Sequence, residues 1–493
     1  MQIEILAKLP VQIPVLVLGA HEGRRLTPTA AAWDKQLGGT LKRAMAAGRF
    51  TGARDQKLDI VAPAGIPQRR ILLVGLGTAR TLTPAAAEEI GGRIENALAQ
   101  LGEAEAGTAL DLPGGLAAHV ALGAILGGQR FVKLRTRPRP EDVKPVGRLV
   151  LAAKATAAAE RAFARLAPVA DGIGLARSLV NEPANLLGPE EFVRRARKLA
   201  SLGVKIEVLD EAALKRLGME ALLAVGAGSA RRPRLLILRW KGRGAKPGRG
   251  PVAFVGKGVC FDAGGLDLKK AEGMEAMNTD MAGAAAVVGA IKALALRKAP
   301  IEAVGIAALV ENLASDTAYR PGDVIRTLAG ETVEIINTDA EGRVILADAL
   351  AYTVRRFKPR AIVDLATLTY AVGAALGHFH AGILCNNDAL ARRLIAAGRE
   401  TGDRLWRLPI GKEYDANLVS AIADVRQIAP DSDAADASHG AQFLQHFVGD
   451  TPWAHLDIAY TGMMAPREKP TQPKGATGFG VRLLDAFAES YEA

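Results

Sequence analysis

The chain has 493 residues, of which 49% are hydrophobic and 23% are charged, and its formal net charge is +11. This composition is that of a globular protein, and the length exceeds one ordinary domain, so we expect two. Only Cys260 and Cys385 carry thiols, which excludes a disulfide scaffold and favours a reducing compartment. The sequence shows neither a signal peptide nor about 18 uninterrupted apolar residues. We therefore expect no membrane span and a cytoplasmic location.

Residues 1–160 are predicted to form an N-terminal α/β domain. Residues 11–17 and 71–74 are typical of strands, and residues 84–101 of a helix whose N-cap would be Thr83. Gly75 and Gly77 follow a strand, but Arg80 stands where a dinucleotide-binding loop has its third glycine. A plain turn is the favoured interpretation.

A connecting helix is expected from about residue 155 to residue 180. Residues 161–493 are predicted to contain most of this helix and a second α/β domain. An amphipathic helix is expected at 190–202, and strands at 204–208, 234–239, 252–255, 303–309 and 361–365. Strands separated by helices favour a parallel or mixed sheet covered on both faces. The predicted fold class is therefore α/β, with two domains that each have a central mixed sheet flanked by helices.

Two carboxylates and a guanidinium alternate in the segment NTDAEGR at 337–343. In an extended backbone Asp339, Glu341 and Arg343 would point to the same side. A predicted strand at 333–336 and a predicted apolar helix at 344–350 enclose the segment, which favours a site over a solvated acidic turn. Two neighbouring carboxylates suit a divalent cation, whereas Arg343 suits an anion.

A second cluster of charged residues lies upstream, where a strand at 252–255 is expected to end in a glycine-rich turn. Lys257 and Asp262 belong to this turn, and Lys269 and Asp280 follow it. A structural ion pair would explain Lys257 and Asp262 alone. Together the two clusters offer four carboxylates and no nearby histidine, which suits two ions that share oxygen ligands. Such a pair activates water and polarises a carbonyl, beside which a lysine and an arginine stabilise negative charge.

With these segments in place, the chain resembles the leucyl aminopeptidase family, the dinuclear metallopeptidases of the M17 type. The matching segments are NEPAN (181–185), VGKGVCFDAGGLDLK (255–269), MNTDMAGAAA (277–286), ENLASDTAYRPGDVI (311–325), NTDAEGRVILADAL (337–350), VDLATLT (363–369) and WAHLDIA (453–459). The resemblance covers residues 180–480 and implies that the second domain is catalytic and releases leucine-type N-terminal amino acids from short peptides with a free N-terminus.

The resemblance also implies roles for individual residues. The ligands of two divalent ions, zinc or manganese, would be Lys257, Asp262, Asp280, Asp339 and Glu341, of which Asp262 and Glu341 would bridge. Lys269 would stabilise the tetrahedral intermediate, and Arg343 would hold a bicarbonate that acts as general base. The substrate-binding residues would be Met277, Thr367, Leu368, Tyr370 and Ala459. The family further implies a homohexamer.

Two departures from the family pattern border the expected substrate pocket. Tyr370 and Tyr460 stand where the family has glycine, and Ala263 replaces a serine. Two rings in place of two hydrogens should narrow or reshape the pocket. We therefore expect altered specificity, towards smaller or polar N-terminal residues, with the metal chemistry unchanged.

The sequence also bears on four other functions. The motifs HExxH and GxSxG are absent, which disfavours a single-zinc peptidase and a serine hydrolase. An inactive member of the family is disfavoured because every metal-site and catalytic residue type is retained. Residues 1–150 hold 20 Lys and Arg against 13 Asp and Glu, so most of the positive charge lies there. Solubility explains this excess, and a DNA-binding or architectural role is the alternative.

Overall fold

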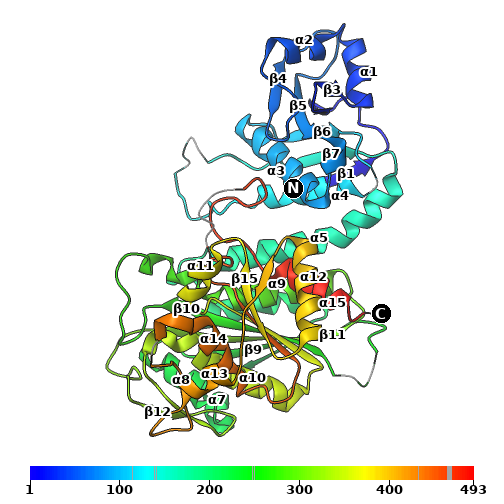
Figure 1. The fold of residues 1–493 in the computed structure, drawn as a ribbon. Helices are drawn as coiled ribbons and strands as arrows, with labels where there is room; N and C mark the ends of the chain where they lie inside the picture. The colour runs from blue at the N-terminus through cyan, green and yellow to red at the C-terminus, as the bar shows by residue number, and fades with distance from the viewer. Residues whose placement is uncertain are drawn as a thin grey trace. The chain divides into compact units, whose positions relative to one another are not determined.

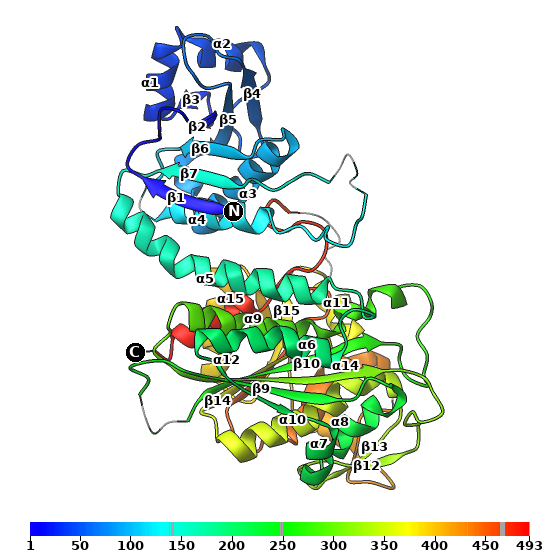
Figure 2. The same cartoon turned by 180° about the vertical axis from the view of Figure 1, so that it is seen from behind.

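The computed structural model describes all residues except 114, 138, 140, 141, 247, 249, 431, 464–468 and 493, and the side chains of 432–434 are also left out. The chain divides into two compact units. Unit 1 comprises residues 1–170 and 467–474, and unit 2 comprises residues 171–466 and 475–493. Each has a mixed sheet flanked by helices, so the predicted fold class is confirmed (Figures 1 and 2).

Unit 1 contains a seven-stranded sheet in the order β1-β7-β6-β2-β5-β4, with β3 paired to β2. Its strands are β1 (Gln2–Leu6), β2 (Val15–His21), β3 (Arg25–Leu26), β4 (Lys57–Val61), β5 (Arg70–Gly77), β6 (Glu105–Ala109) and β7 (Arg148–Ala152). Its helices are α1 (Pro28–Gln36), α2 (Thr40–Ala47), the 3-10 turn η1 (Ala79–Thr81), α3 (Pro84–Gln100), α4 (Leu116–Gly127) and the first part of α5 (Thr156–Val180).

Alternating side chains of β2 build two cores, one on each face of this sheet. Val15 and Val17 pack with α3 and α4, whereas Leu16 and Leu18 pack with α1 and α2. Successive side chains of a strand point to opposite faces, and both faces are covered here, which explains why residues 15–20 of β2 are all apolar. The predicted N-cap is confirmed, because Thr83 Oγ1 accepts a hydrogen bond from Ala86 N at 3.2 Å.

Unit 2 contains an eight-stranded sheet in the order β16-β15-β18-β14-β10-β11-β9-β8 and a small sheet β12-β13-β17. Its strands are β8 (Lys205–Leu209), β9 (Arg234–Lys241), β10 (Val252–Asp262), β11 (Glu302–Asn312), β12 (Val324–Arg326), β13 (Thr332–Glu334), β14 (Ala361–Ala366), β15 (Ala381–Cys385), β16 (Leu405–Arg407), β17 (Val425–Arg426) and β18 (Trp453–Asp457). Its α-helices after α5 are α6 (Pro189–Ala196), α7 (Glu211–Leu217), α8 (Glu220–Val225), α9 (Ala282–Leu296), α10 (Glu341–Phe357), α11 (Tyr370–Leu376), α12 (Asp388–Thr401), α13 (Lys412–Asp415), α14 (Ser432–Gln445) and α15 (Val481–Glu489). Its 3-10 turns are η2 (Arg197–Leu202), η3 (Gly226–Gly228), η4 (Met274–Met281), η5 (Thr338–Ala340) and η6 (Ala416–Leu418).

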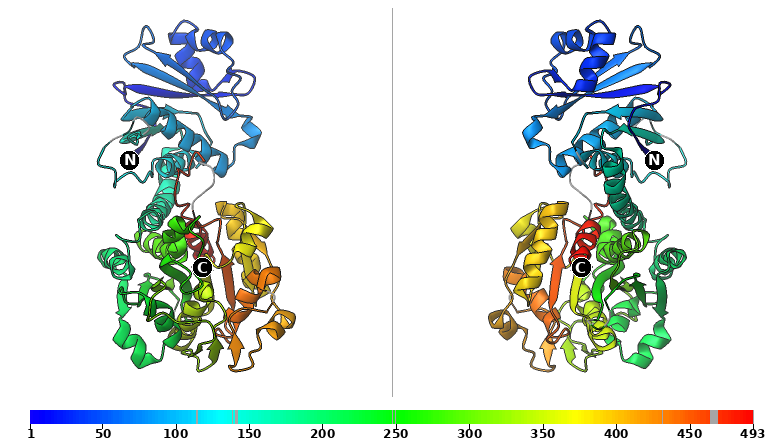
Figure 3. Two further views of the ribbon diagram at one scale, coloured as in Figure 1. Left: turned by 90° about the vertical axis from the view of Figure 1, so that its left-hand side faces the viewer. Right: turned by 90° about the vertical axis from the view of Figure 1, so that its right-hand side faces the viewer.

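Helices cover both faces of the large sheet (Figure 3). Residues of α8, α10 and α14 share one core with Ala253 and Val255 of β10, and α9 packs on β10 and β11 with α15 beside it. The stretch Met274–Leu296 is long and apolar enough to cross a membrane, yet 89% of its apolar window is buried. By its burial it is a core helix of unit 2.

Several predicted boundaries differ from the structure. The strand expected at 11–17 begins only at Val15, after Pro14, which has no N–H to donate. The helix expected at 190–202 changes at Arg197 into a 3-10 helix. The turn expected at Lys257 and Asp262 was wrong, because β10 continues to Asp262 and pairs with the parallel strand β11 along this stretch. Its glycines serve close packing, since a Cβ on Gly256 would lie 2.5 Å from the backbone of α9.

Candidate metal and substrate site

The charged residues of the two clusters meet at the carboxyl ends of parallel strands in unit 2. Lys257 and Asp262 lie on β10, Asp280 on η4, Asp339 on η5 and Glu341 at the start of α10. Open α/β sheets place their ligands at this edge, because the strands end there together and the loops converge. Segments 80 residues apart in the chain are thereby brought into one site.

Asp262, Asp280 and Glu341 form the centre of the site. Their ligand oxygens all lie within 4.8 Å of one another, and the three residues are 2%, 4% and 1% exposed. Two ammonium groups face them. Lys257 Nζ lies 2.8 Å from Asp280 Oδ2 and 2.7 Å from Glu341 Oε1. Lys269 Nζ lies 2.9 Å from Asp262 Oδ2 and also pairs with Asp339.

The pKa values of the carboxyl groups reflect this crowding. Burial, together with neighbouring carboxylates, raises the pKa of Asp280 and Glu341 and raises that of Asp339 to about 7. Burial alone would lower the pKa of Lys257 and Lys269, but the facing carboxylates outweigh it and raise both. Four carboxyl groups face only two ammonium groups, so a further cation among them would favour the ionised carboxylates.

Several carboxylate oxygens in the centre accept no hydrogen bond. Glu341 Oε2 is buried without any partner, and Glu341 Oε1 and Asp280 Oδ2 lie near Lys257 without hydrogen-bond geometry. Buried carboxylate oxygens without donors are costly unless a cation neutralises them. The donor set consists of hard oxygens, to which Lys257 adds an amine once a bound ion lowers its pKa, and it fits divalent ions.

The segment NTDAEGR reaches the site in a conformation that differs from the expected one. It is not extended: Asp339 lies in η5, and Glu341 and Arg343 lie in the first turn of α10. Asn337 starts the turn, because its side-chain oxygen accepts a hydrogen bond from Asp339 N at 2.7 Å. A Cβ on Gly342 would lie 2.6 Å from Lys257 Cε, so glycine there lets the lysine approach α10.

Asn312 and Tyr319 support the centre, and no role was predicted for them. Asn312 Nδ2 donates to Asp262 Oδ1 at 2.8 Å and to the carbonyl of Thr338 at 3.0 Å, and Tyr319 Oη donates to the same carbonyl at 2.7 Å. Both residues belong to the segment 311–325 that carried the resemblance. Both side chains are uncharged, so the pattern of charged residues that predicted the ligands does not include them.

Arg343 is 2% exposed and lies beside the carboxylates. Its Nη1 donates to the carbonyl of Gln427 at 2.9 Å, and its Nη2 donates to Asp436 Oδ1 at 2.6 Å. Its Nε has no acceptor within the described chain. One anion beside Arg343 is thus a carboxylate of the chain itself, that of Asp436, for which no role was predicted.

A cavity of about 410 Å³ opens next to this centre. It is lined by all of the site residues expected from the sequence except Glu341, which lies beneath: Lys257, Asp262, Lys269, Met277, Asp280, Asp339, Arg343, Thr367, Leu368, Tyr370 and Ala459. Asp457 was not predicted, but it ties two segments of the wall together. Its Oδ1 accepts hydrogen bonds from Leu368 N and Ala459 N, each at 3.2 Å.

Two tyrosines narrow this cavity. Tyr370, at the start of α11, is 63% exposed, and its ring centroid lies 5.7 Å from Lys269 Nζ. Tyr460 has a φ of 64°, which is unfavourable for a bulky side chain. Its ring contacts His378, with centroids 5.2 Å apart.

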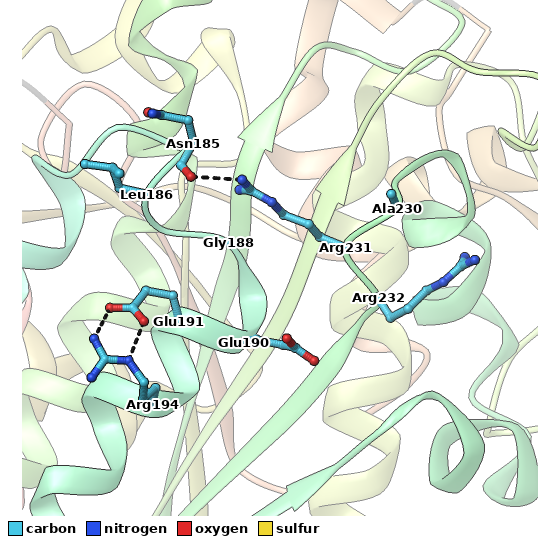
Figure 4. A pocket seen from close by; sticks show the side chains of 9 residues that line it. All are labelled: Asn185, Leu186, Gly188, Glu190, Glu191, Arg194, Ala230, Arg231 and Arg232. Carbon is cyan, nitrogen blue, oxygen red and sulfur yellow. Dashed lines mark hydrogen bonds and ion pairs between the residues drawn. The ribbon is translucent and has the colours of Figure 1, made fainter.

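Another cavity of unit 2, of about 480 Å³, lies at the start of α6 (Figure 4). Each of its charged side chains is paired: Glu191 and Arg194 with each other, Glu190 with Arg234, Arg231 with Glu311 and Arg232 with Glu211. Arg231 also donates to the carbonyl of Asn185 at 2.9 Å. Despite its larger volume, this cavity offers no unpaired group for chemistry, so the carboxylate cavity is the candidate site.

The fold and the site together define a class: an α/β protein whose buried carboxylates and lysines are arranged to hold divalent cations. Comparison with known proteins identifies the family. Residues 17–138 match the N-terminal domain of the cytosol aminopeptidase family, and residues 174–485 match its catalytic domain.

Whole-chain relatives agree with these matches. The chain is 47% identical to a probable cytosol aminopeptidase of Caulobacter vibrioides, over 97% of this chain and 96% of the relative. It is 46% identical to a protein with the same name from a Bradyrhizobium species, over the same shares.

Solved structures agree as well. The bottromycin maturation enzyme BotP in complex with Mn superposes with a TM-score of 0.84 at 34% identity, over 98% of this chain and 100% of that one. A mutant of tomato leucine aminopeptidase superposes with a TM-score of 0.87 at 32% identity, over 99% and 96%. The chain belongs to the cytosol aminopeptidase family, M17, and is a metallopeptidase of the aminopeptidase class.

Proposed function

We propose that the protein releases leucine-type N-terminal amino acids from short peptides and uses two divalent metal ions to do so. The observation that carries this proposal is the group of Asp262, Asp280 and Glu341, whose buried oxygens converge within 4.8 Å and include atoms without any hydrogen-bond donor. Manganese and zinc both suit such ligands, and a solved relative is bound to Mn.

The residues that would hold the ions are Lys257, Asp262, Asp280, Asp339 and Glu341. Ions held there would polarise the scissile carbonyl and lower the pKa of a water molecule. Lys269 is proposed to donate hydrogen bonds to the oxyanion that develops from this carbonyl, since its ammonium group already faces two carboxylates at the cavity floor.

Arg343 is proposed to hold a bicarbonate that accepts the proton of the attacking water. Its buried guanidinium has an Nε without an acceptor, which leaves a donor for an anion beside the bond to Asp436. Asp436 already neutralises part of the charge of Arg343. A bound bicarbonate would therefore need to share the guanidinium with this carboxylate or displace it.

The substrate wall is proposed to consist of Met277, Thr367, Leu368, Tyr370 and Ala459, with the backbone of Leu368 positioning the peptide. We further propose that Tyr370 and Tyr460 shift the preference towards smaller or polar N-terminal residues. Both rings line the cavity, and the Tyr460 ring is held in place by its neighbours.

The proposed division of labour places catalysis in residues 161–493 and oligomer formation or regulation in residues 1–160. A homohexamer is proposed on the family resemblance. Catalytic domains that meet at its centre would admit only short peptides to the active sites. A cytoplasmic location is proposed because the relatives are named cytosol aminopeptidases and the chain has two free, buried cysteines.

The test is hydrolysis of a leucine chromogenic amide, with and without chelator and added Mn²⁺, by the wild type and by Glu341→Ala. We expect the chelator to abolish activity, Mn²⁺ to restore it, and the variant to lose several orders of magnitude of activity, because a bridging ligand is removed. Metal content by mass spectrometry should fall in parallel. Glu400→Ala, which removes an exposed carboxylate on α12, is the matched control. Full activity of Glu341→Ala would refute the proposal.

A further inference from the structure

A cavity of about 340 Å³ in unit 1 has no part in the proposed peptidase chemistry. It lies between the start of β4, β5, α3 and residues 469–470, and its volume is within the roughly 300–1,000 Å³ range of small-molecule sites. Four cationic side chains line it: Arg54, Lys57, Arg93 and Lys469. Among its lining residues only Asp55 is acidic, and Asp55 is exposed. We call this cavity the cationic pocket.

The four cations lack carboxylate partners within the described chain. Arg54 Nη2 donates to Thr81 Oγ1 at 3.1 Å and Lys57 Nζ donates to Gln100 Oε1 at 3.3 Å, so both use neutral acceptors. Arg93 Nε is buried and has no acceptor in the described part of the protein. A buried donor left unpaired destabilises the fold. An acceptor supplied from outside the chain would remove that cost.

The pocket is held in shape by packing. Lys469 arrives from far along the chain in a tight turn, in which Lys469 N donates to the carbonyl of Gln472 at 3.0 Å and Gln472 N donates back at 2.9 Å. The carbonyl of Pro470 accepts a hydrogen bond from Asn96 Nδ2 at 3.3 Å. A Cβ on Gly92 would lie 2.3 Å from this carbonyl, so α3 and the turn are in direct contact.

The floor of the pocket differs from its rim. Val74 of β5 and Ile90 of α3 are 6% and 2% exposed and present apolar surface, whereas the cations stand around them. Arginine forks and lysine ammonium groups match phosphate oxygens in charge and hydrogen bonding. A ligand that combines a phosphate with an uncharged, partly apolar portion would satisfy both parts.

We propose that the cationic pocket binds a small phosphorylated molecule, with its phosphate against Arg54, Lys57, Arg93 and Lys469 and its uncharged portion on Val74 and Ile90. This inference goes beyond the aminopeptidase, because unit 1 contains none of the residues of the metal site. Phosphate binding would give part of the excess of Lys and Arg in residues 1–150 a specific role.

The test is calorimetric titration of the full-length protein at low salt with ATP, inorganic pyrophosphate and adenosine. We expect saturable binding of ATP and pyrophosphate, with Kd below roughly 1 mM, and no binding of adenosine. Arg93→Gln and the exposed Lys57→Gln should each weaken binding at least tenfold. Lys42→Gln removes the same charge from α2 of the same unit, outside the pocket, and should leave binding unchanged.

Phosphates also bind metal ions, so Glu341→Gln is titrated in parallel and should retain binding. Loss of binding in Glu341→Gln with retention in Arg93→Gln would assign the ligand to the metal site and overturn the proposal. Equal binding of adenosine and ATP would overturn the phosphate assignment. Binding of a duplex DNA oligonucleotide without binding of ATP or pyrophosphate would show a nucleic-acid surface in place of a small-molecule pocket.

Discussion

Gly373 of α11 and Tyr460 are packed so closely that a Cβ on Gly373 would lie 2.2 Å from the ring carbons Cδ2 and Cε2 of Tyr460. The backbone of the tyrosine is held as well, because His378 Nδ1 lies 3.1 Å from its carbonyl oxygen. A ring in this position needs a glycine opposite it. The two residues therefore pack as one unit, of which Tyr460 lines the carboxylate cavity.

Gly373→Ala should destabilise the protein, although alanine is usually the better helix former by about 1 kcal/mol. The added methyl would force the Tyr460 ring out of place, and overpacking of this kind costs roughly 1–3 kcal/mol. The measurement is the urea midpoint of unfolding.

In the Tyr460→Gly background the same Gly373→Ala change should become neutral or stabilising, because the ring that the methyl would meet is absent. Tyr460→Gly is itself compatible with the backbone, because the positive φ of residue 460 suits glycine. Equal effects of Gly373→Ala in both backgrounds would show that the two residues are energetically independent.

Tyr460→Gly should also change which substrates are cleaved. Removing the ring enlarges the cavity, so the ratio of kcat/KM for leucine amide to that for alanine amide should rise by about tenfold or more. Tyr370→Gly should affect this ratio less, because its ring stands largely exposed at the rim near Lys269. Rates over a panel of aminoacyl amides measure the effect. A plain leucine optimum in the wild type would refute the proposed shift in specificity.

His446 should make unit 2 less stable at alkaline pH. Its Nδ1 lies 3.5 Å from Glu331 and its Nε2 lies 2.8 Å from Asp415, and these carboxylates, Glu331 foremost, raise the pKa of His446 against the effect of burial. The folded pKa exceeds the unfolded value of about 6.5. The stabilisation is therefore complete below that pH and is lost as the pH rises through the folded pKa.

His446→Gln should accordingly lower the free energy of unfolding by roughly 0.5–1 kcal/mol near pH 6, a small value because Asp415 is 46% exposed. The difference from wild type should shrink by pH 9. Urea midpoints at both pH values measure it, and Asp415→Asn should show the same trend. A constant difference between pH 6 and pH 9 would contradict the assignment.

Most of the fold could be predicted from the sequence because the core strands are continuous apolar runs between turn residues. The strands at 71–74, 303–309 and 361–365 all lie within observed strands. The glycine-rich segment of β10 was misread as a turn, because Gly256 and Gly258 resemble turn residues. Only the approach of α9 shows that they permit close packing.

Some residues of the site could likewise be predicted from the sequence, and others could not. Charged residues such as Asp262 and Glu341 could be selected because clustered carboxylates point to cations. Asn312, Asp436 and Asp457 could not, because their partners lie dozens of residues away and their residue types are common in loops. The alternation of Asp339, Glu341 and Arg343 suggested an extended strand, but the Asn337 cap starts a helical turn there.

The short turn that carries Lys469 and Pro470 belongs to unit 1, although the residues on both sides of it belong to unit 2. Neither unit is thus encoded by a single uninterrupted stretch of the gene. A truncation after residue 170 would uncover the side of α3 at Gly92 and Asn96 that the Pro470 carbonyl contacts. To express the two units separately, residues 469–474 would have to be joined to unit 1, and exchanges of N-terminal portions between relatives would need to include this segment.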